Sequence, residues 1–139
     1  MTIESGIPYN LKLDDADGTA RDISDAVTNV SVNTPRSTQD ITTLGNVGMA
    51  KLLLLVDLTG TINGLFDPAA NQLHDVLKTV PTSSAARTLA HAPIGVSTGD
   101  PVLTAETLLT DYGITRAQDG SITTTAPFML TGGEAPVWS

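Results

Sequence analysis

The chain has 139 residues, no cysteine, and a net charge of −8 from 7 basic and 15 acidic side chains. This length allows one compact domain and is too short for two well-packed ones. The lack of cysteine excludes disulfides, thiolate metal sites and a cysteine nucleophile, and an acidic surface repels nucleic acid instead of gripping it. We therefore expect a single domain spanning residues 1–139.

The first third of the chain is predicted to hold two strands and a long loop. Apolar residues alternate with other residues from Ile7 to Leu13, and a second strand is expected over about 26–33. The polar stretch that follows contains Pro35 and predicts a long inter-strand loop over about 34–50. A loop of this length inside a small domain is usually functional or disordered.

The clearest strand pattern runs from Lys51 to Phe66. Every even position in this range is apolar or glycine, which predicts a half-buried strand with its even positions inside. Leu53 and Leu55 break the pattern because they are apolar on the polar face. Either a second layer of the same chain or another subunit is expected to cover them. The apolar run at 52–56 is far too short to span a membrane.

One helix is predicted over about 68–80. Asp67 is a good N-cap, Pro68 suits the first helical position, and Pro81 ends the pattern. The apolar stripe with helical spacing is formed by Leu73, Val76, Leu77 and Val80.

The last part of the chain is predicted to add a strand near 87–92 and a long hairpin. The arms of the hairpin run over about 102–115 and 122–130, and an extended tail follows over about 131–139. About seven strands with one helix indicate a mainly β fold. We expect a β-sandwich or partly closed barrel with one flanking helix and a long inter-strand loop.

Residues that could carry chemistry are few. The stretch 95–99 fits the nucleophile pattern G-x-S-x-G, but Pro93 and Pro101 flank it, so we interpret Ser97 as part of a loop. The chain offers only His74 and His91 as histidines, and no phosphate loop or dinucleotide fingerprint. We therefore expect no enzymatic activity, no cofactor and no metal site.

Three features remain that fit a subunit of an assembly. They are the long loop, the strand with apolar residues on both faces, and the tail with the only tryptophan. Exposed apolar strand surface normally has to be covered, and oligomerisation covers it. A local second core, a disordered loop and a frayed terminus would explain the same features in a monomer.

Three stretches of the chain resemble phage major tail (tail tube) proteins. The stretch 17–24 followed by 41–45 (Asp-Gly-Thr-Ala-Arg-Asp-Ile-Ser, then Ile-Thr-Thr-Leu-Gly) is similar to their opening. The stretch 58–67, leading into a short helix, is similar to their central strand and helix, and 119–133 is similar to their ending. The resemblance covers most of the chain.

This resemblance implies a structural virion protein without a cofactor. Six subunits would form a ring in which their sheets combine into an inner β-barrel, and rings would stack into a tube that conducts DNA during ejection. The loop over about 34–50 would bridge neighbouring subunits or rings. The implied partners are further copies of the chain, the tape measure protein, the terminator protein and, where the tail has one, the sheath protein. DNA would pass through the tube without specific binding, and no membrane would be involved. The protein would be assembled in the host cytoplasm and reside in the virion tail.

A negatively charged lumen would let the phosphate backbone slide without being caught. The acids that we expect to face it are Asp14, Asp15, Asp17, Glu106 and Asp111. The residues that we expect at subunit or ring interfaces are Pro35, Arg36, Ile41, Leu44, Leu53, Leu55 and Trp138.

Other functions stay open at this point. A capsid decoration or head–tail connector protein can also be a small β domain, and tubes of stacked rings would distinguish the tail tube from both. A monomeric β-sandwich module that binds a carbohydrate or peptide would need a concave aromatic patch, for which five aromatic residues are a thin supply. A small hydrolase would depend on Ser97 alone.

Overall fold

The computed structural model describes residues 9–96 and 98–139. Within them the strands and the helix are β1 (Asn10–Asp14), β2 (Ala20–Asp22), β3 (Val27–Asn33), β4 (Arg36–Asp40), β5 (Lys51–Val56), β6 (Thr59–Leu65), α1 (Leu73–Leu77), β7 (Arg87–Ala92), β8 (Leu103–Leu109), β9 (Gly113–Arg116), β10 (Ile122–Leu130) and β11 (Val137–Trp138). The prediction of a mainly β fold with one helix is confirmed. The described residues contain no helix with the length and apolarity of a membrane span.

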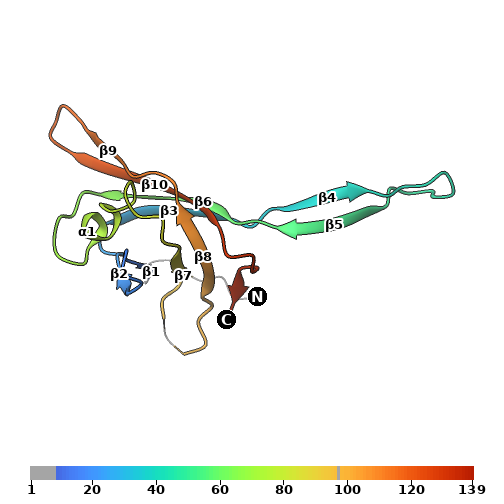
Figure 1. The fold of residues 1–139 in the computed structure, drawn as a ribbon, viewed down its shortest axis with the longest axis horizontal. Coiled ribbons are helices and arrows are strands. Elements are labelled where there is room, and N and C mark those ends of the chain that lie inside the picture. Colours follow the sequence, from blue (N-terminus) through green and yellow to red (C-terminus); the bar gives the residue numbers. More distant parts are fainter. Residues whose placement is uncertain (1–8, 97) are drawn as a thin grey trace.

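Most strands belong to one antiparallel sheet with the order β2-β1-β7-β8-β10-β6-β3 (Figure 1). β9 pairs with β10, and β11 pairs with β8. β2 and β3 stand at the two ends of this order, so the sheet is open and does not close on itself as a barrel. The predicted strands over 26–33, 87–92 and 122–130 are confirmed as β3, β7 and β10. Of the strand predicted from Ile7, the first two residues lie outside the described residues.

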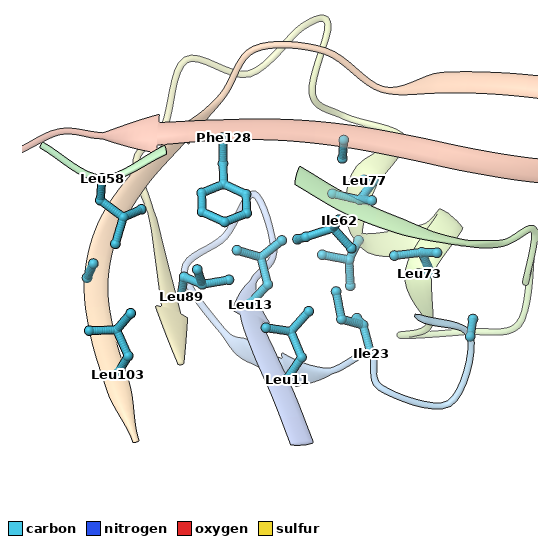
Figure 2. Packing of buried hydrophobic residues seen from close by; sticks show 14 residues of the cluster. Leu11, Leu13, Ile23, Leu58, Ile62, Leu73, Leu77, Leu89, Leu103 and Phe128 are labelled. Carbon is cyan, nitrogen blue, oxygen red and sulfur yellow. The ribbon is translucent and has the colours of Figure 1, made fainter. Parts of the chain in front are cut away.

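One face of the sheet packs against α1 and forms the core. Side chains alternate along each strand, so that Ala126 and Phe128 of β10 and Ile62 of β6 all point inward. Figure 2 shows Phe128 pointing toward Leu13 and Leu89. The remaining buried apolar residues of this cluster are Leu11, Ile23, Ala26, Leu58, Leu73, Val76, Leu77, Leu103 and Ala105.

The predicted loop over 34–50 is partly wrong, because it contains β4. β4 pairs with β5 in a separate two-stranded ribbon, and Figure 1 shows this ribbon extending away from the sheet. All five residues of β4 are polar and exposed, so no alternation marks them as a strand. We call residues 36–56, from the start of β4 to the end of β5, the arm.

The single strand predicted from Lys51 to Phe66 is also divided. β5 belongs to the arm and β6 to the sheet. The expected burial of even positions is confirmed for Ile62 but wrong for Leu52 and Leu54, which are 49% and 39% exposed. The reason is that β5 pairs with β4 and leaves the body, so neither of its faces meets the core.

The helix is shorter than predicted and begins after a turn. Asn71 takes a left-handed φ of 63°, which interrupts any helix that starts at Pro68. Asp67 still accepts a hydrogen bond from the N–H of Ala69 at 3.1 Å, but Gln72 is the N-cap. Of the helix predicted over 68–80, only Leu73–Leu77 is therefore helical, the part that holds most of the apolar stripe.

The C-terminal segments differ from the prediction in two places. The strand expected over 102–115 is divided into β8 and β9 at residues 110–112. The expected tail over 131–139 turns back and pairs as β11 with the start of β8, with Trp138 opposite Leu103.

Candidate functional site

The arm concentrates the exposed apolar surface of the protein. Of the fourteen large hydrophobic side chains that are exposed in the described residues, eight lie on it. They are Ile41, Leu44, Val47, Met49, Leu52, Leu53, Leu54 and Leu55. Exposed apolar patches of this kind mark interaction sites on soluble proteins.

Hydrogen bonds at the base and at the outer end hold the arm as a ribbon. The N–H of Asp57 donates to the carbonyl oxygen of Pro35 at 2.8 Å, and the Arg36 guanidinium donates to the Leu54 carbonyl through Nε at 3.2 Å and Nη2 at 3.0 Å. Farther out, the N–H of Ile41 donates to the Ala50 carbonyl at 3.0 Å. The arm is therefore an ordered projection with both strands paired to each other.

The face of the sheet opposite the core is polar and uncharged over three adjacent strands. β3, β6 and β10 together contain no charged residue. Their outward residues are mainly hydroxyl and amide side chains: Asn29, Ser31, Asn33, Thr59, Thr61, Asn63, Thr123 and Thr125. We call these residues the polar face. Thr125 donates to the Asn63 side-chain oxygen at 3.0 Å, so neighbouring strands are also linked across it.

Charged residues appear where this face continues onto β1, β7 and β8, and they are Lys12, Asp14 and Glu106. Glu106 accepts a hydrogen bond from the Thr88 hydroxyl, and Asp14 accepts one from the Thr88 N–H at 3.3 Å. Glu134 lines the same shallow hollow as Thr88 and Glu106. Two of the five predicted lumen acids, Asp14 and Glu106, are thus brought together around Thr88.

The other three predicted lumen acids lie elsewhere. Asp15 and Asp17 belong to the β1–β2 turn and share a small hollow with Asp75 and Lys78 at α1. Asp15 accepts hydrogen bonds from the N–H groups of Asp17 and Thr19, both at 3.0 Å, and pairs with Arg21 at 3.1 Å.

These contacts explain the acidity of Asp15. The Thr19 N–H and the Arg21 guanidinium hold the pKa of the Asp15 carboxyl below its usual range. This carboxylate stabilises its own turn.

Asp111 lies in the β8–β9 connection, where it accepts a hydrogen bond from the N–H of Tyr112 at 2.8 Å.

Comparison with known proteins identifies the fold. No protein-family model and no curated protein matches the sequence. Among solved structures, the chain is similar to one from the tail of an empty gene transfer agent particle, which was computed with helical refinement and C6 symmetry. The TM-score is 0.77, the sequence identity is 14%, and the match covers 99% of both chains. A chain from the virion of a native gene transfer agent has a TM-score of 0.75 at 13% identity, again over 99% of both chains. The SPP1 tail tube has a TM-score of 0.71 at 8% identity, covering 99% of this chain and 79% of that one.

The chain has the tail tube fold.

The residues predicted for interfaces in this tail tube fold gather mostly on or beside one element. Ile41, Leu44, Leu53 and Leu55 lie on the arm with Arg36, and Pro35 lies at its base. Trp138, which is 55% exposed, lies apart on β11.

Sequence reasoning missed four apolar residues of the arm: Val47, Met49, Leu52 and Leu54. The run of four leucines could have found Leu52 and Leu54, because strand alternation places such a run on both faces, whereas Val47 and Met49 lie outside any strand and carry no such signal. It also missed Glu134, which only the turn after β10 brings beside Glu106.

The aromatic side chains of this tail tube fold do not form a shared platform. Phe128 is buried, Tyr9 contacts His91, and Phe66 and Tyr112 both contact His74. His74 is part-buried, and its Nδ1 lies 3.0 Å from the Tyr112 hydroxyl. Trp138 is separate from all of them on β11. The concave aromatic patch that a carbohydrate-binding module needs is thus missing from the described residues.

The described residues also contain no cluster of metal-ligating side chains. Ser97, the one candidate nucleophile, lies outside the described residues.

Proposed function

We propose that the chain is the tail tube subunit of a tailed phage or phage-like particle, in which six copies form a ring and rings stack into a tube. The observation that carries this proposal is the fold shared with tail chains over nearly the whole length. The other tail proteins would be its partners, the virion tail its location and the host cytoplasm its place of assembly. The open sheet supports the proposal, because pairing β2 and β3 with neighbouring copies would remove both free edges.

In this tube the polar face would line the lumen. Its hydroxyl and amide groups offer no cation to a passing phosphate backbone, so DNA releases no counterions by touching the wall and is not held. Asp14, Glu106 and Glu134 outnumber Lys12 of the same face and would leave net negative charge on the side of β1, β7 and β8. The negative lumen charge would thus come from one end of the sheet face, with an uncharged wall beside it.

Negative-stain electron microscopy of the purified protein over a range of concentrations tests the assembly. We expect six-fold rings at moderate concentration and hollow tubes at high concentration. Dispersed monomers that persist at the highest concentration would contradict the proposal and favour a decoration or connector role.

Single cysteines test which face lines the lumen, because the chain has no thiol of its own. Thr123→Cys places a thiol on the polar face, and Ser84→Cys places one on the exposed connection between α1 and β7. Both thiols should react with a maleimide that carries a bulky polymer when the protein is monomeric. In assembled tubes only Ser84→Cys should react, while a small maleimide still reaches both. Equal protection of the two sites, or protection of Ser84→Cys alone, would contradict a lumen lined by the polar face.

A further inference from the structure

The chain contains one Asn-Gly pair, Asn63–Gly64, and this pair lies inside a strand. The other asparagines all precede residues with a side chain. Asparagine is chemically labile, most of all before glycine, because glycine has no side chain to hinder the approach of its nitrogen to the asparagine amide. Asn-Gly is typical of hairpin turns. Here it belongs to β6, which lies between β3 and β10.

The packing of β6 requires the glycine of this pair. Gly64 is buried, and a Cβ atom there would stand 2.6 Å from the Ala26 carbonyl oxygen and 2.8 Å from Cδ2 of Leu73. Both distances are far below van der Waals contact, so a larger residue would push β6 away from α1 and from the segment before β3. The residue that makes the amide labile is therefore one that the fold needs.

The asparagine of the pair is held by both neighbouring strands. Its side-chain Oδ1 accepts a hydrogen bond from the Thr125 hydroxyl at 3.0 Å, and its main-chain carbonyl accepts one from the Thr28 hydroxyl at 3.3 Å. In the sheet register Asn63 lies opposite Thr125 of β10 and Asn29 of β3. Its backbone and its side chain are thus both fixed in the folded protein.

The extended conformation of β6 keeps the reacting atoms apart. Deamidation begins when the main-chain nitrogen of Gly64 attacks Cγ of Asn63. In an antiparallel strand ψ is about +135°, and this angle directs the next nitrogen away from a side chain that points out of the sheet. The attack therefore requires a rotation that would break the pairing of β6 with β3 and β10.

We propose that Asn63 is a deamidation site that is closed in the folded sheet and open while β6 is unpaired. In the unpaired chain the Gly64 nitrogen forms a bond to Cγ of Asn63, the Cγ–NH2 bond breaks, and ammonia leaves with the proton of the Gly64 amide. Water then opens the cyclic imide at one of its two carbonyl carbons, which gives aspartate or isoaspartate at position 63. This inference does not depend on the proposed tube.

Each product changes the polar face in its own way. Aspartate places a negative charge among three strands, β3, β6 and β10, that contain none. Isoaspartate routes the main chain through the former side chain and lengthens it by one carbon atom. Residues before and after position 63 then cannot both keep their register with β10. A chain with isoaspartate at this position should therefore fail to rebuild the sheet.

Peptide mass spectrometry of the wild-type protein tests the site, after incubation at mildly alkaline pH along a series of urea concentrations. We expect conversion at Asn63 to be roughly tenfold or more faster in the unfolded chain than in the folded one, because reaction in the folded protein has to wait for the strand to open. The rate should follow the unfolded fraction measured by circular dichroism. A rate that is equal in both states, or that does not follow unfolding, would overturn the inference.

Refolding gives a second test with matched variants. Asn63→Gln keeps an amide at this position, but the attack on it would form a larger ring that closes more slowly. After long incubation in urea, the wild-type protein should lose refolding yield in proportion to its isoaspartate content, while Asn63→Gln should refold like fresh protein. Asn46→Gln, which replaces an asparagine that precedes valine, should lose as much as the wild type. Equal losses in all three proteins would overturn the role of position 63.

Discussion

Arg87 shows at the scale of one residue how this fold holds its only described helix. The side chain is 2% exposed, and its guanidinium donates through Nη1 to the Val76 carbonyl at 2.6 Å and through Nη2 to the Thr79 hydroxyl at 2.9 Å. Val76 lies in the last turn of α1, where carbonyl groups lack partners within the helix and a cation is favoured. Burial lowers the pKa of Arg87, while the nearby Asp15 and Asp14 act against this shift. Arg87 thus connects α1 to β7.

Replacing Arg87 by methionine should destabilise the fold. Arg87→Met keeps much of the volume but leaves the buried Val76 carbonyl without its donor, so we expect the free energy of unfolding to fall by about 2–3 kcal/mol. Urea denaturation of the monomer measures this loss. Arg116→Met, at an exposed position on β9, should change the free energy by less than about 0.5 kcal/mol. A loss of that small size at Arg87 as well would contradict the structural role.

His91 makes the fold sensitive to mild acid. Its Nδ1 lies 2.8 Å from the Tyr9 hydroxyl, and burial lowers the pKa of His91 while raising that of Tyr9. The unfolded chain, with a histidine pKa of about 6.5, therefore binds a proton more readily than the folded chain. The stability that this difference contributes is present above pH 6.5 and declines as the pH falls from there toward the pKa of the folded state.

The expected outcome is a free energy of unfolding that decreases from pH 7 to pH 5 and decreases less in His91→Gln. Urea denaturation at several pH values measures both slopes. An imidazole pKa at or above 6.5 in the folded protein, determined by NMR titration, would refute the explanation.

At the scale of elements, glycines allow β6 to lie close to its neighbours. A Cβ atom on Gly60 would stand 2.1 Å from the Ser31 carbonyl oxygen and 2.5 Å from Cζ of Phe128. The bulky Phe128 ring thus fills the space that a side chain on Gly60 would need. The same strand has Gly64, whose Cβ would meet the backbone of Ala26 at 2.6 Å.

Gly60→Ala should therefore lower the free energy of unfolding by about 1–3 kcal/mol through overpacking. Thermal or urea unfolding of the monomer measures the effect. Gly113→Ala is the matched control on β9, because its Cβ would meet only the Thr125 carbonyl oxygen at 3.8 Å, an ordinary contact. Equal stabilities of the two variants would show that β6 can move away without cost.

At the scale of the whole molecule, charge is distributed unevenly. The chain has a net charge of −8, yet the adjacent strands β3, β6 and β10 contain no charged residue. These strands form the face that we propose for the lumen. A neutral wall repels DNA less than an acidic one and holds it less than a basic one, so it suits passage.

A ring of lysines should convert this wall into a binding surface. Tubes of Thr123→Lys should protect short duplex DNA from nuclease at low salt, and this protection should disappear as the salt concentration rises. Wild-type tubes should give little protection. Tubes of Ser84→Lys control for DNA bound outside the lumen, since nuclease digests it there. Strong protection by wild-type tubes would contradict a non-binding wall.

How far the sequence predicts this molecule depends on the range of the interactions involved. The strands β3 and β10 follow from local alternation, β7 is marked only weakly in the sequence, and the apolar stripe that includes Leu73 and Leu77 places α1 correctly. The left-handed conformation of Asn71 is not visible in that stripe, so the predicted helix is too long. For the candidate site, the sequence indicates that Leu53 and Leu55 are apolar residues on the polar face of the predicted strand. It cannot show that Leu52 and Leu54 are exposed as well.

The sequence by itself determined the mainly β character, the central apolar alternation, the absence of charge from β3, β6 and β10, and the acidic surplus, because these properties belong to neighbouring residues or to composition. Only the tertiary structure decided that β5 leaves the body to pair with the polar β4, that the tail returns as β11 beside β8, and that Asp14, Glu106 and Glu134 meet around Thr88. These arrangements depend on backbone pairing between segments that are separated along the chain. A leucine on β5 is exposed because β5 pairs with β4 and not with the strands of the sheet. The local sequence pattern does not indicate which strand β5 pairs with.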